Sequence, residues 1–173
     1  MNLLALLMAT TLLDFDDDAD VALWRPVDDV VMGGVSRSSF GPAGPGVARF
    51  GGTVSLENSG GFASVRTPPR DWDTPGATAL VLRVRGDGHT FKFTLRTGDG
   101  LDGIQYQARF APPAGEWTEV RLPVGSFVAT FRGRTVPDAP PLDPARVRAL
   151  GLMISDQQAG PFELLVDSIG VER

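Results

Sequence analysis

The chain has 173 residues, a formal net charge of −5, one histidine and no cysteine. That length suits a single domain with a full hydrophobic core. The missing cysteines exclude disulfides, thiolate nucleophiles and sulfur-ligated metal sites, and the acidic balance excludes a general attraction to nucleic acid or to anionic membranes.

The amino-terminal segment is apolar but short. Its purely apolar stretch, Leu3–Met8, is too short to span a bilayer, and the segment has no lysine or arginine to begin a secretory signal. We therefore expect an apolar tail over residues 1–11, one domain over residues 12–173, no transmembrane span and a cytoplasmic chain. Export is the alternative if the apolar segment acts as a signal.

The acidic run Asp14–Asp20 places carboxylates at alternate positions, as a calcium loop does. Ala19 stands where the turn glycine of such a loop belongs, and Arg25 where its bidentate glutamate belongs. The pattern therefore indicates a solvated acidic loop, and we expect neither a metal nor a cofactor.

Period-2 alternation of apolar and polar residues dominates the rest of the chain, as in half-buried strands. The expected strands are Thr11–Phe15, Val47–Leu56, Phe62–Thr67, Leu80–Arg85, Phe91–Arg96, Ile104–Phe110, Trp117–Pro123, Ala149–Ile154 and Phe162–Val171. Asp87-Gly88 favours a tight hairpin between two of them. The one helical signal is Asp143–Val147, enough for a single turn. With 21 glycines and 14 prolines spread along the chain, the pattern predicts an all-β, antiparallel sandwich.

Signals for catalysis are weak. The sole imidazole, His89, follows a turn and is exposed by pattern, and no Gly-x-Ser-x-Gly elbow occurs. The spacing of Asp and Glu along the sequence does not show that two carboxylates lie close enough in space for glycoside cleavage. We expect no enzyme, with chemistry at an Asp28/Asp29 loop as a weaker alternative.

Three segments combine polar residues with glycines in a way that is unusual for strands. They are Trp24–Ser36, Leu56–Arg66 and Gly151–Phe162. The candidate residues for binding a partner or ordering these loops are Asp28, Asp29, Met32, Gly33, Gly34, Ser36, Asn58, Gly60, Gly61, Phe62, Arg66, Asp156 and Gln157. The simpler interpretation is that all three segments are tight turns held by side-chain hydrogen bonds to the backbone.

These segments also resemble the complex I intermediate-associated protein 30 family. Its pattern begins with Trp followed at a distance by Val-Asn-Asp-Gly-Val-Met-Gly-Gly-x-Ser, and continues with Asn-Gly-Gly-Phe-x-Ser-x-Arg, then Gly-Leu-x-Ile-x-Asp and Gly-Pro-Phe. The matching residues are Trp24, Asp29, Val31, Met32, Gly33, Gly34, Ser36, Gly60, Gly61, Phe62, Ser64, Arg66, Gly151, Leu152, Ile154, Asp156, Gly160, Pro161 and Phe162. Asp28 stands where the pattern prefers Asn, and Val30 where it prefers Gly.

The resemblance implies a galactose-binding-like jelly roll of two antiparallel sheets, here the bare domain in a bacterial setting. It also implies a non-catalytic protein-binding chaperone for the assembly of respiratory NADH:ubiquinone oxidoreductase, with respiratory-complex subunits or assembly factors as partners. The runner-up function is a carbohydrate-binding or lectin-like module, and one form of this alternative includes a calcium ion that stabilises the module. Sugar platforms display aromatic faces to solvent, and Trp72 is the expected exposed aromatic residue here.

Two structural expectations follow from the three segments. The pairs Gly33-Gly34 and Gly60-Gly61 should include positive-φ positions, so valine there should cost roughly 1–3 kcal/mol of stability. The three loops should converge, with Asp29 in a charge-assisted contact with Arg66. The alternative for Asp29 is that it binds backbone amides within its own turn.

Overall fold

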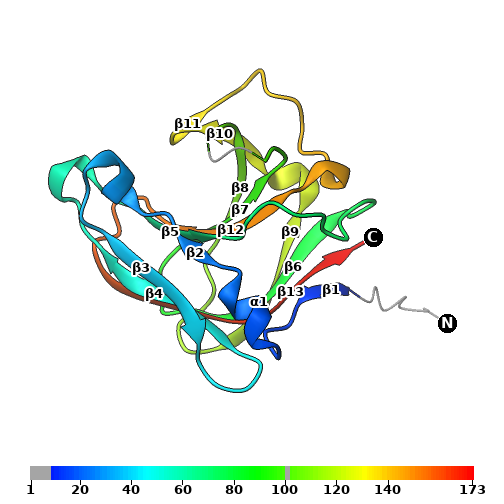
Figure 1. The fold of residues 1–173 in the computed structure, drawn as a ribbon, viewed down its shortest axis with the longest axis horizontal. Helices are drawn as coiled ribbons and strands as arrows, with labels where there is room; N and C mark the ends of the chain where they lie inside the picture. The colour runs from blue at the N-terminus through cyan, green and yellow to red at the C-terminus, as the bar shows by residue number, and fades with distance from the viewer. Residues whose placement is uncertain (1–8, 100–101) are drawn as a thin grey trace.

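Two antiparallel sheets pack face to face in the computed structural model, which describes residues 9–99 and 102–173 (Figure 1). The expected apolar tail therefore lies mostly outside the described residues, and Thr10 and Thr11 already belong to the first strand. The described residues contain one α-helix of five residues, α1 (Asp18–Ala22), so the all-β jelly-roll prediction is confirmed.

One sheet has the strand order β3-β4-β13-β6-β9, and β1 also pairs with β13. Its strands are β1 (Thr10–Leu13), β3 (Arg37–Pro42), β4 (Ala48–Val54), β6 (Ala79–Arg85), β9 (Trp117–Pro123) and β13 (Gly160–Glu172). We call this the six-stranded sheet. Strand β13 lies at its centre, pairing with both β4 and β6.

The other sheet has the order β11-β10-β8-β7-β12-β5-β2. Its strands are β2 (Arg25–Pro26), β5 (Ala63–Arg66), β7 (Phe91–Arg96), β8 (Gln105–Phe110), β10 (Val128–Phe131), β11 (Arg134–Thr135) and β12 (Ala149–Ile154). We call this second sheet the seven-stranded sheet.

Four short 3₁₀ turns complete the described secondary structure: η1 (Asp29–Met32), η2 (Glu57–Ser59), η3 (Val124–Ser126) and η4 (Pro144–Arg146).

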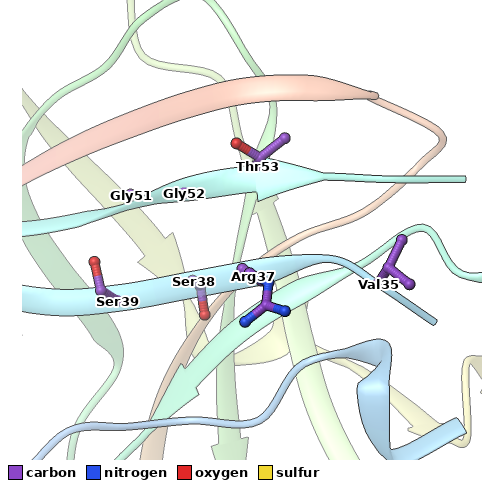
Figure 2. Close-up of a pocket in the computed structure, with 7 residues that line it drawn as sticks. All are labelled: Val35, Arg37, Ser38, Ser39, Gly51, Gly52 and Thr53. Atoms are coloured by element: carbon purple, nitrogen blue, oxygen red, sulfur yellow. The ribbon is translucent and has the colours of Figure 1, made fainter. Parts of the chain in front are cut away.

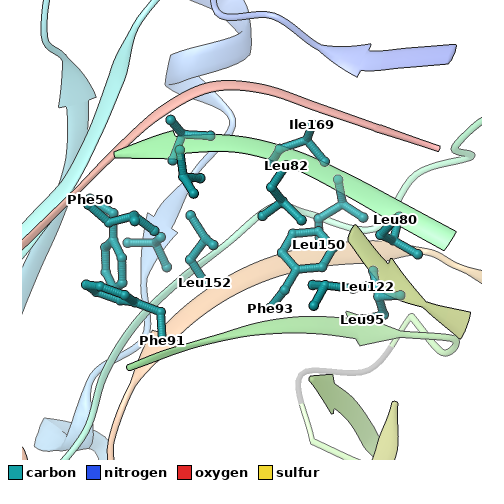
Figure 3. Close-up of a cluster of buried hydrophobic side chains, with 14 of the residues drawn as sticks. Phe50, Leu80, Leu82, Phe91, Phe93, Leu95, Leu122, Leu150, Leu152 and Ile169 are labelled. Atoms are coloured by element: carbon teal, nitrogen blue, oxygen red, sulfur yellow. The ribbon is translucent and has the colours of Figure 1, made fainter. Parts of the chain in front are cut away.

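The core forms where the apolar phases of the two sheets meet. Figure 3 shows Phe93 and Leu150 of the seven-stranded sheet directed toward Leu82 of the six-stranded sheet, and all three are fully buried. Each such side chain contributes about 1.5–3 kcal/mol by leaving water. Because the strand period is two, the residues between these core positions face outward, and this phase decides what the outer surface presents.

The expected hairpin at Asp87-Gly88 is wrong. Strand β6 belongs to the six-stranded sheet and β7 to the seven-stranded sheet, so the link crosses from one layer to the other. Gly88 has the positive φ, +95°, that turn chemistry requires. The Asp87 carboxylate accepts hydrogen bonds from the backbone N–H groups of His89, at 3.0 Å, and Glu163, at 2.7 Å. A turn signal describes local backbone geometry, and it does not determine which strands pair.

Three smaller expectations are corrected or refined. The acidic run is partly helical, because Asp17 caps α1 by accepting from the Ala19 N–H at 2.9 Å. Trp72 is buried, not exposed, and its indole N–H donates to the carbonyl of Arg148 at 3.1 Å. The helical signal at Asp143–Val147 becomes the single 3₁₀ turn η4, capped by the Asp143 side chain.

Candidate functional site

Two of the three candidate segments lie side by side. The first loop, residues 27–36, leaves the edge strand β2 and turns through η1 into β3, and the second loop, residues 55–62, leaves β4 and turns through η2 into β5. Figure 1 shows the two loops together beyond the ends of β3 and β4. The predicted convergence is therefore found for these two segments.

Asp29 joins the two loops. Its carboxylate accepts from the backbone N–H of Ser36 at 2.8 Å and from the Ser36 hydroxyl at 2.5 Å, both within the first loop. It also accepts from the N–H groups of Gly61, at 2.8 Å, and Phe62, at 3.3 Å, in the second loop. The side chain is 1% exposed. A single carboxylate thus satisfies donors that lie more than twenty residues apart in sequence.

The neighbouring carboxylate, Asp28, connects one strand of each sheet in a similar way. Its carboxylate accepts from the N–H and the hydroxyl of Ser38, at 2.8 and 2.6 Å, and from the N–H of Ser64 at 3.0 Å. It therefore links β3 of one sheet to β5 of the other. Ser38 and Ser64 complete these contacts. Neither was among the predicted site residues, although Ser64 matches the family pattern.

Hydrogen bonding controls the ionisation of Asp29. Burial acts to raise the pKa of its carboxyl, but the hydrogen bonds from Ser36, Gly61 and Phe62 outweigh burial and hold that pKa below its ordinary value. The buried carboxylate is therefore charged at neutral pH, and its oxygens are occupied by donors from the protein itself.

Small residues surround this carboxylate. A Cβ atom on Gly34 would lie 2.4 Å from Cγ of Asp29, and one on Gly60 would lie 2.5 Å from its Oδ2. Gly33 and Gly61 have positive φ angles, +90° and +139°, so the expectation that the glycine pairs include such positions is confirmed. One glycine of each pair therefore supplies backbone freedom, and the other supplies space for Asp29.

The third segment is held by different partners. Asp156 accepts from Nζ of Lys92 at 3.1 Å and from Nε of Arg109 at 3.1 Å. Hydrogen bonding to Arg109 is the main cause that keeps the pKa of Asp156 below its ordinary value. Because Ile154 of β12 pairs with Ala63 of β5, this loop reaches the same end of the seven-stranded sheet as the second loop. Its contacts, however, tie it to β7 and β8.

Of the remaining candidates, two lie in loops with left-handed backbone conformations and one lies on a strand. Asn58 and Gln157 are exposed and occupy the left-handed region, with φ of 55° and 59°. Arg66 is half-buried on β5, and the hydrogen bonds that stabilise the Asp29 carboxylate come from Ser36, Gly61 and Phe62. The printed donors to Asp29 are neutral, and they come from both loops and not only from its own turn.

Four apolar side chains on the two joined loops are exposed, which the sequence did not reveal. Val30, Met32, Val35 and Leu56 are exposed by 57, 69, 41 and 45%. We call these four residues the loop patch. Leu56 lies at the second loop beside Gly61, with its Cδ2 atom 3.4 Å from a Cβ placed there. The sequence predicted only Met32 as a candidate, because exposure of an isolated Val or Leu cannot be seen from alternation within a loop.

A depression of about 450 Å³ adjoins the patch at Val35. Figure 2 shows its lining along β3 and β4, where Gly51 and Gly52 carry no side chains. Gly52 is required because a Cβ there would lie 2.0 Å from the carbonyl oxygen of Arg37. Of the loop patch, Val35 lines this depression, which lies over the paired strands β3 and β4.

We expect the contribution of Asp29 to stability to depend on pH. Its pKa is lower in the folded chain than the usual 3.9 or so of an unfolded aspartate, so its contribution is fully present above that value and is lost as the pH falls through the folded pKa. The difference in free energy of unfolding between the wild type and Asp29→Asn should be constant above about pH 5 and shrink in stronger acid. Urea unfolding at a series of pH values measures this difference, and a difference that does not change with pH would contradict it.

The architecture is that of a β-sandwich module. A family 11 carbohydrate-binding module of a cellulase of Clostridium thermocellum superposes with a TM-score of 0.70 over 96% of both chains, at 15% sequence identity. A second structure of this module, in complex with a mixed-linked tetrasaccharide, gives a TM-score of 0.68 at 16% identity over 95% of both chains. At such low identity the likeness concerns the fold alone.

Residues 13–166 match the complex I intermediate-associated protein 30 family, so the chain belongs to that family. It is 28% identical over 153 residues to the mitochondrial complex I intermediate-associated protein 30 of Neurospora crassa. The aligned region covers 79% of this chain and 55% of that protein. It is 30% identical over 166 residues to an uncharacterised protein of Schizosaccharomyces pombe, covering 84% of this chain and 76% of that one. The chain thus spans little more than half the length of the mitochondrial relative.

Within residues 9–99 and 102–173, no helix is both long and apolar enough to cross a bilayer.

Proposed function

We propose that this chain is a non-catalytic protein-binding domain that acts in the assembly of respiratory NADH:ubiquinone oxidoreductase. The mitochondrial relatives support this proposal by name, since each is called complex I intermediate-associated protein 30. The single observation that carries it is the loop patch, an apolar surface on two loops that a buried carboxylate holds in place.

The chemistry of the patch suits a protein partner. Met32 is the most exposed of its members, and methionine is a flexible, polarisable side chain that is enriched at protein interfaces. Apolar side chains held on ordered loops lose less entropy on binding than side chains on mobile ones. The four residues would therefore form the buried centre of an interface, and the serine-rich depression beside Val35 would lie at its rim.

The Asp28/Asp29 loop gives little support to an enzyme. A general acid or base must reach a substrate, but the Asp29 carboxylate is 1% exposed and its oxygens accept hydrogen bonds from Ser36, Gly61 and Phe62. Asp28 is similarly occupied by Ser38 and Ser64. Both carboxylates order the loops.

The carbohydrate-binding alternative rests on the fold. Sugar platforms present aromatic faces to solvent, whereas Phe91, Phe93, Tyr106 and Phe110 of the seven-stranded sheet are buried in the core. The outward positions of the central strands β5, β12, β7 and β8 are Ser64, Arg66, Ala149, Gly151, Met153, Lys92, Thr94, Arg96, Gln105, Gln107 and Arg109. An aromatic platform is missing from this set.

Affinity capture of the tagged chain from its native cells tests the proposal. Respiratory-complex subunits or assembly factors should co-purify with the wild type and be lost, by about tenfold or more, with Val30→Asp, because a carboxylate at an interface centre must be desolvated. Val128→Asp is the matched control, since Val128 is exposed to a similar degree on β10, away from the two loops.

Two results would overturn the proposal. One is equal recovery of the partners with both variants, which would place the interface elsewhere. The other is a wild-type preparation that captures no respiratory protein but binds immobilised glycans, which would favour the carbohydrate-binding alternative. Thermal melting of both variants shows whether each remains folded.

A further inference from the structure

The depression over β3 and β4 has a polar lining with a single charged side chain. Ser39 on β3 faces Gly51 on β4, and Arg37 faces Thr53 in the next row of the same two strands (Figure 2). Because Ser39, Gly51 and Thr53 are small, they leave a space of about 450 Å³ that a side chain of another molecule can enter. Among the lining residues that the structure describes, Arg37 alone is charged.

The lining side chains lie on the outer face of the six-stranded sheet. Arg37 and Ser39 are exposed, and they alternate with Ser38, whose hydroxyl donates to the carbonyl of Ser64 in the other sheet at 3.1 Å. Val35 of the loop patch is two residues before Arg37, is also exposed and lines the same depression. This face therefore places an apolar side chain of the loop patch beside a cation.

The Arg37 side chain is not neutralised by the protein itself. Within the described part of the chain, no hydrogen bond, ion pair or ring contact joins its guanidinium to another residue. Two other arginines of the same sheet are paired, Arg49 with Glu163 and Arg121 with Glu172, each at 2.6 Å. A guanidinium presents a planar fork of N–H donors that matches a carboxylate. Arg37 is therefore available to an acidic group from outside the chain.

A partner reaches Arg37 over the face of β3 and not along its edge. Strand β3 is an edge strand of its sheet, and exposed edges can bind an extended peptide through backbone hydrogen bonds. Here, however, the N–H groups of Ser36 and Ser38 already donate to the carboxylates of Asp29 and Asp28, each at 2.8 Å. Because these donors are occupied, recognition at this surface depends on side chains.

We propose that the depression binds an acidic side chain of the protein partner, which pairs with Arg37 while the loop patch covers apolar residues beside that acid. The inference rests on the function proposed above, because it concerns the same interface. The hydroxyls of Ser39 and Thr53 are further donors for a carboxylate. The net charge of −5 repels an acidic partner in general, so a local cation determines where its acid binds and how the partner is oriented.

Reversal of the charge at Arg37 tests the inference. Affinity capture of the partner from native cells should fall by about tenfold or more with Arg37→Glu, because repulsion replaces attraction, and Arg37→Lys should retain most of it. Added salt should weaken capture by the wild type more than capture by Arg37→Gln, since salt screens exposed charges. Arg134→Glu is the matched control, because Arg134 is exposed on β11 at an edge of the other sheet.

Photo-cross-linking locates the acid in the partner. Gly41 follows Ser39 by two residues on β3, and a Cβ placed there meets open space, so benzoylphenylalanine can be introduced at this position. Mass spectrometry should identify a cross-linked partner segment that contains an aspartate or glutamate. Replacing that acid with lysine should restore capture by Arg37→Glu to about half of the wild-type level or more. Such a restoration shows a direct pair, because a misfolded variant would not be rescued in this way.

Each outcome separates this inference from the proposed function. The inference is wrong if Arg37→Glu captures as much partner as the wild type, if Arg134→Glu loses as much, or if the reversed acid restores nothing. Loss of respiratory proteins with Val30→Asp but not with Arg37→Glu would leave the proposed function intact. A charge-reversal rescue with a partner that is not a respiratory protein would overturn only the proposed function. A wild-type chain that captures no protein would overturn both.

Discussion

Replacing Asp29 with alanine should lower the free energy of unfolding by about 3–4 kcal/mol and the melting temperature by about 10 °C. The reason is the number of donors that depend on one buried carboxylate. The N–H groups of Ser36, Gly61 and Phe62 lose a charged acceptor together, in a place where water does not easily replace it. Chemical unfolding followed by fluorescence measures the loss.

Two comparisons make this result specific. Glu116→Ala removes an exposed carboxylate and should change stability by less than about 0.5 kcal/mol. Asp28→Ala should give an intermediate loss, because Asp28 is only half-buried and serves Ser38 and Ser64. A loss at Asp29 no larger than that at Glu116 would contradict the role assigned to the carboxylate.

The effect of Asp29→Ala on partner capture shows whether Asp29 positions the two loops or only stabilises the fold. At a temperature where the variant is still folded, we expect it to capture less partner than the wild type, because the loops that carry Met32 and Leu56 lose their common anchor. Asp29 is then a positioning residue for the loop patch. Capture that survives while stability falls would make the loop a structural element only.

The second large effect is expected at the two glycines that face this carboxylate. Gly34→Ala and Gly60→Ala should each cost about 2–4 kcal/mol, since the new methyl group would overlap Asp29 at 2.4 and 2.5 Å. The carboxylate cannot move aside without losing its donors. At Gly33 a Cβ meets open space, so Gly33→Ala should cost only the backbone strain of a positive φ, about 1–2 kcal/mol.

A double-mutant cycle identifies the clash. In the Asp29→Ala background the atoms that Gly60→Ala would overlap are gone, so the second substitution should cost clearly less than it does in the wild type. Additive losses would mean that the carbonyl groups of Glu57 and Ser55, each 3.0 Å from the same Cβ position, limit the space instead. Thermal melting of the four chains is sufficient to distinguish the two.

The sequence by itself determined the architecture and the type of most main elements, although β3 and β10 were not among the expected strands. Alternation such as Phe91, Phe93 and Leu95 depends only on the two-residue period of a strand, which is a local property. The spread of glycine and proline excluded long helices for a similarly local reason. The positive φ at Gly33 and Gly61 also followed from composition, because glycine alone adopts it without strain.

Tertiary structure decided which of these elements meet. Asp87-Gly88 formed its turn, but the strands on either side entered different sheets, since strand pairing depends on the whole core. The donors for Asp29 come from Gly61 and Phe62, and neutral N–H groups have no sequence signature. Contacts between residues far apart in sequence depend on strand order and register, and local patterns do not encode either.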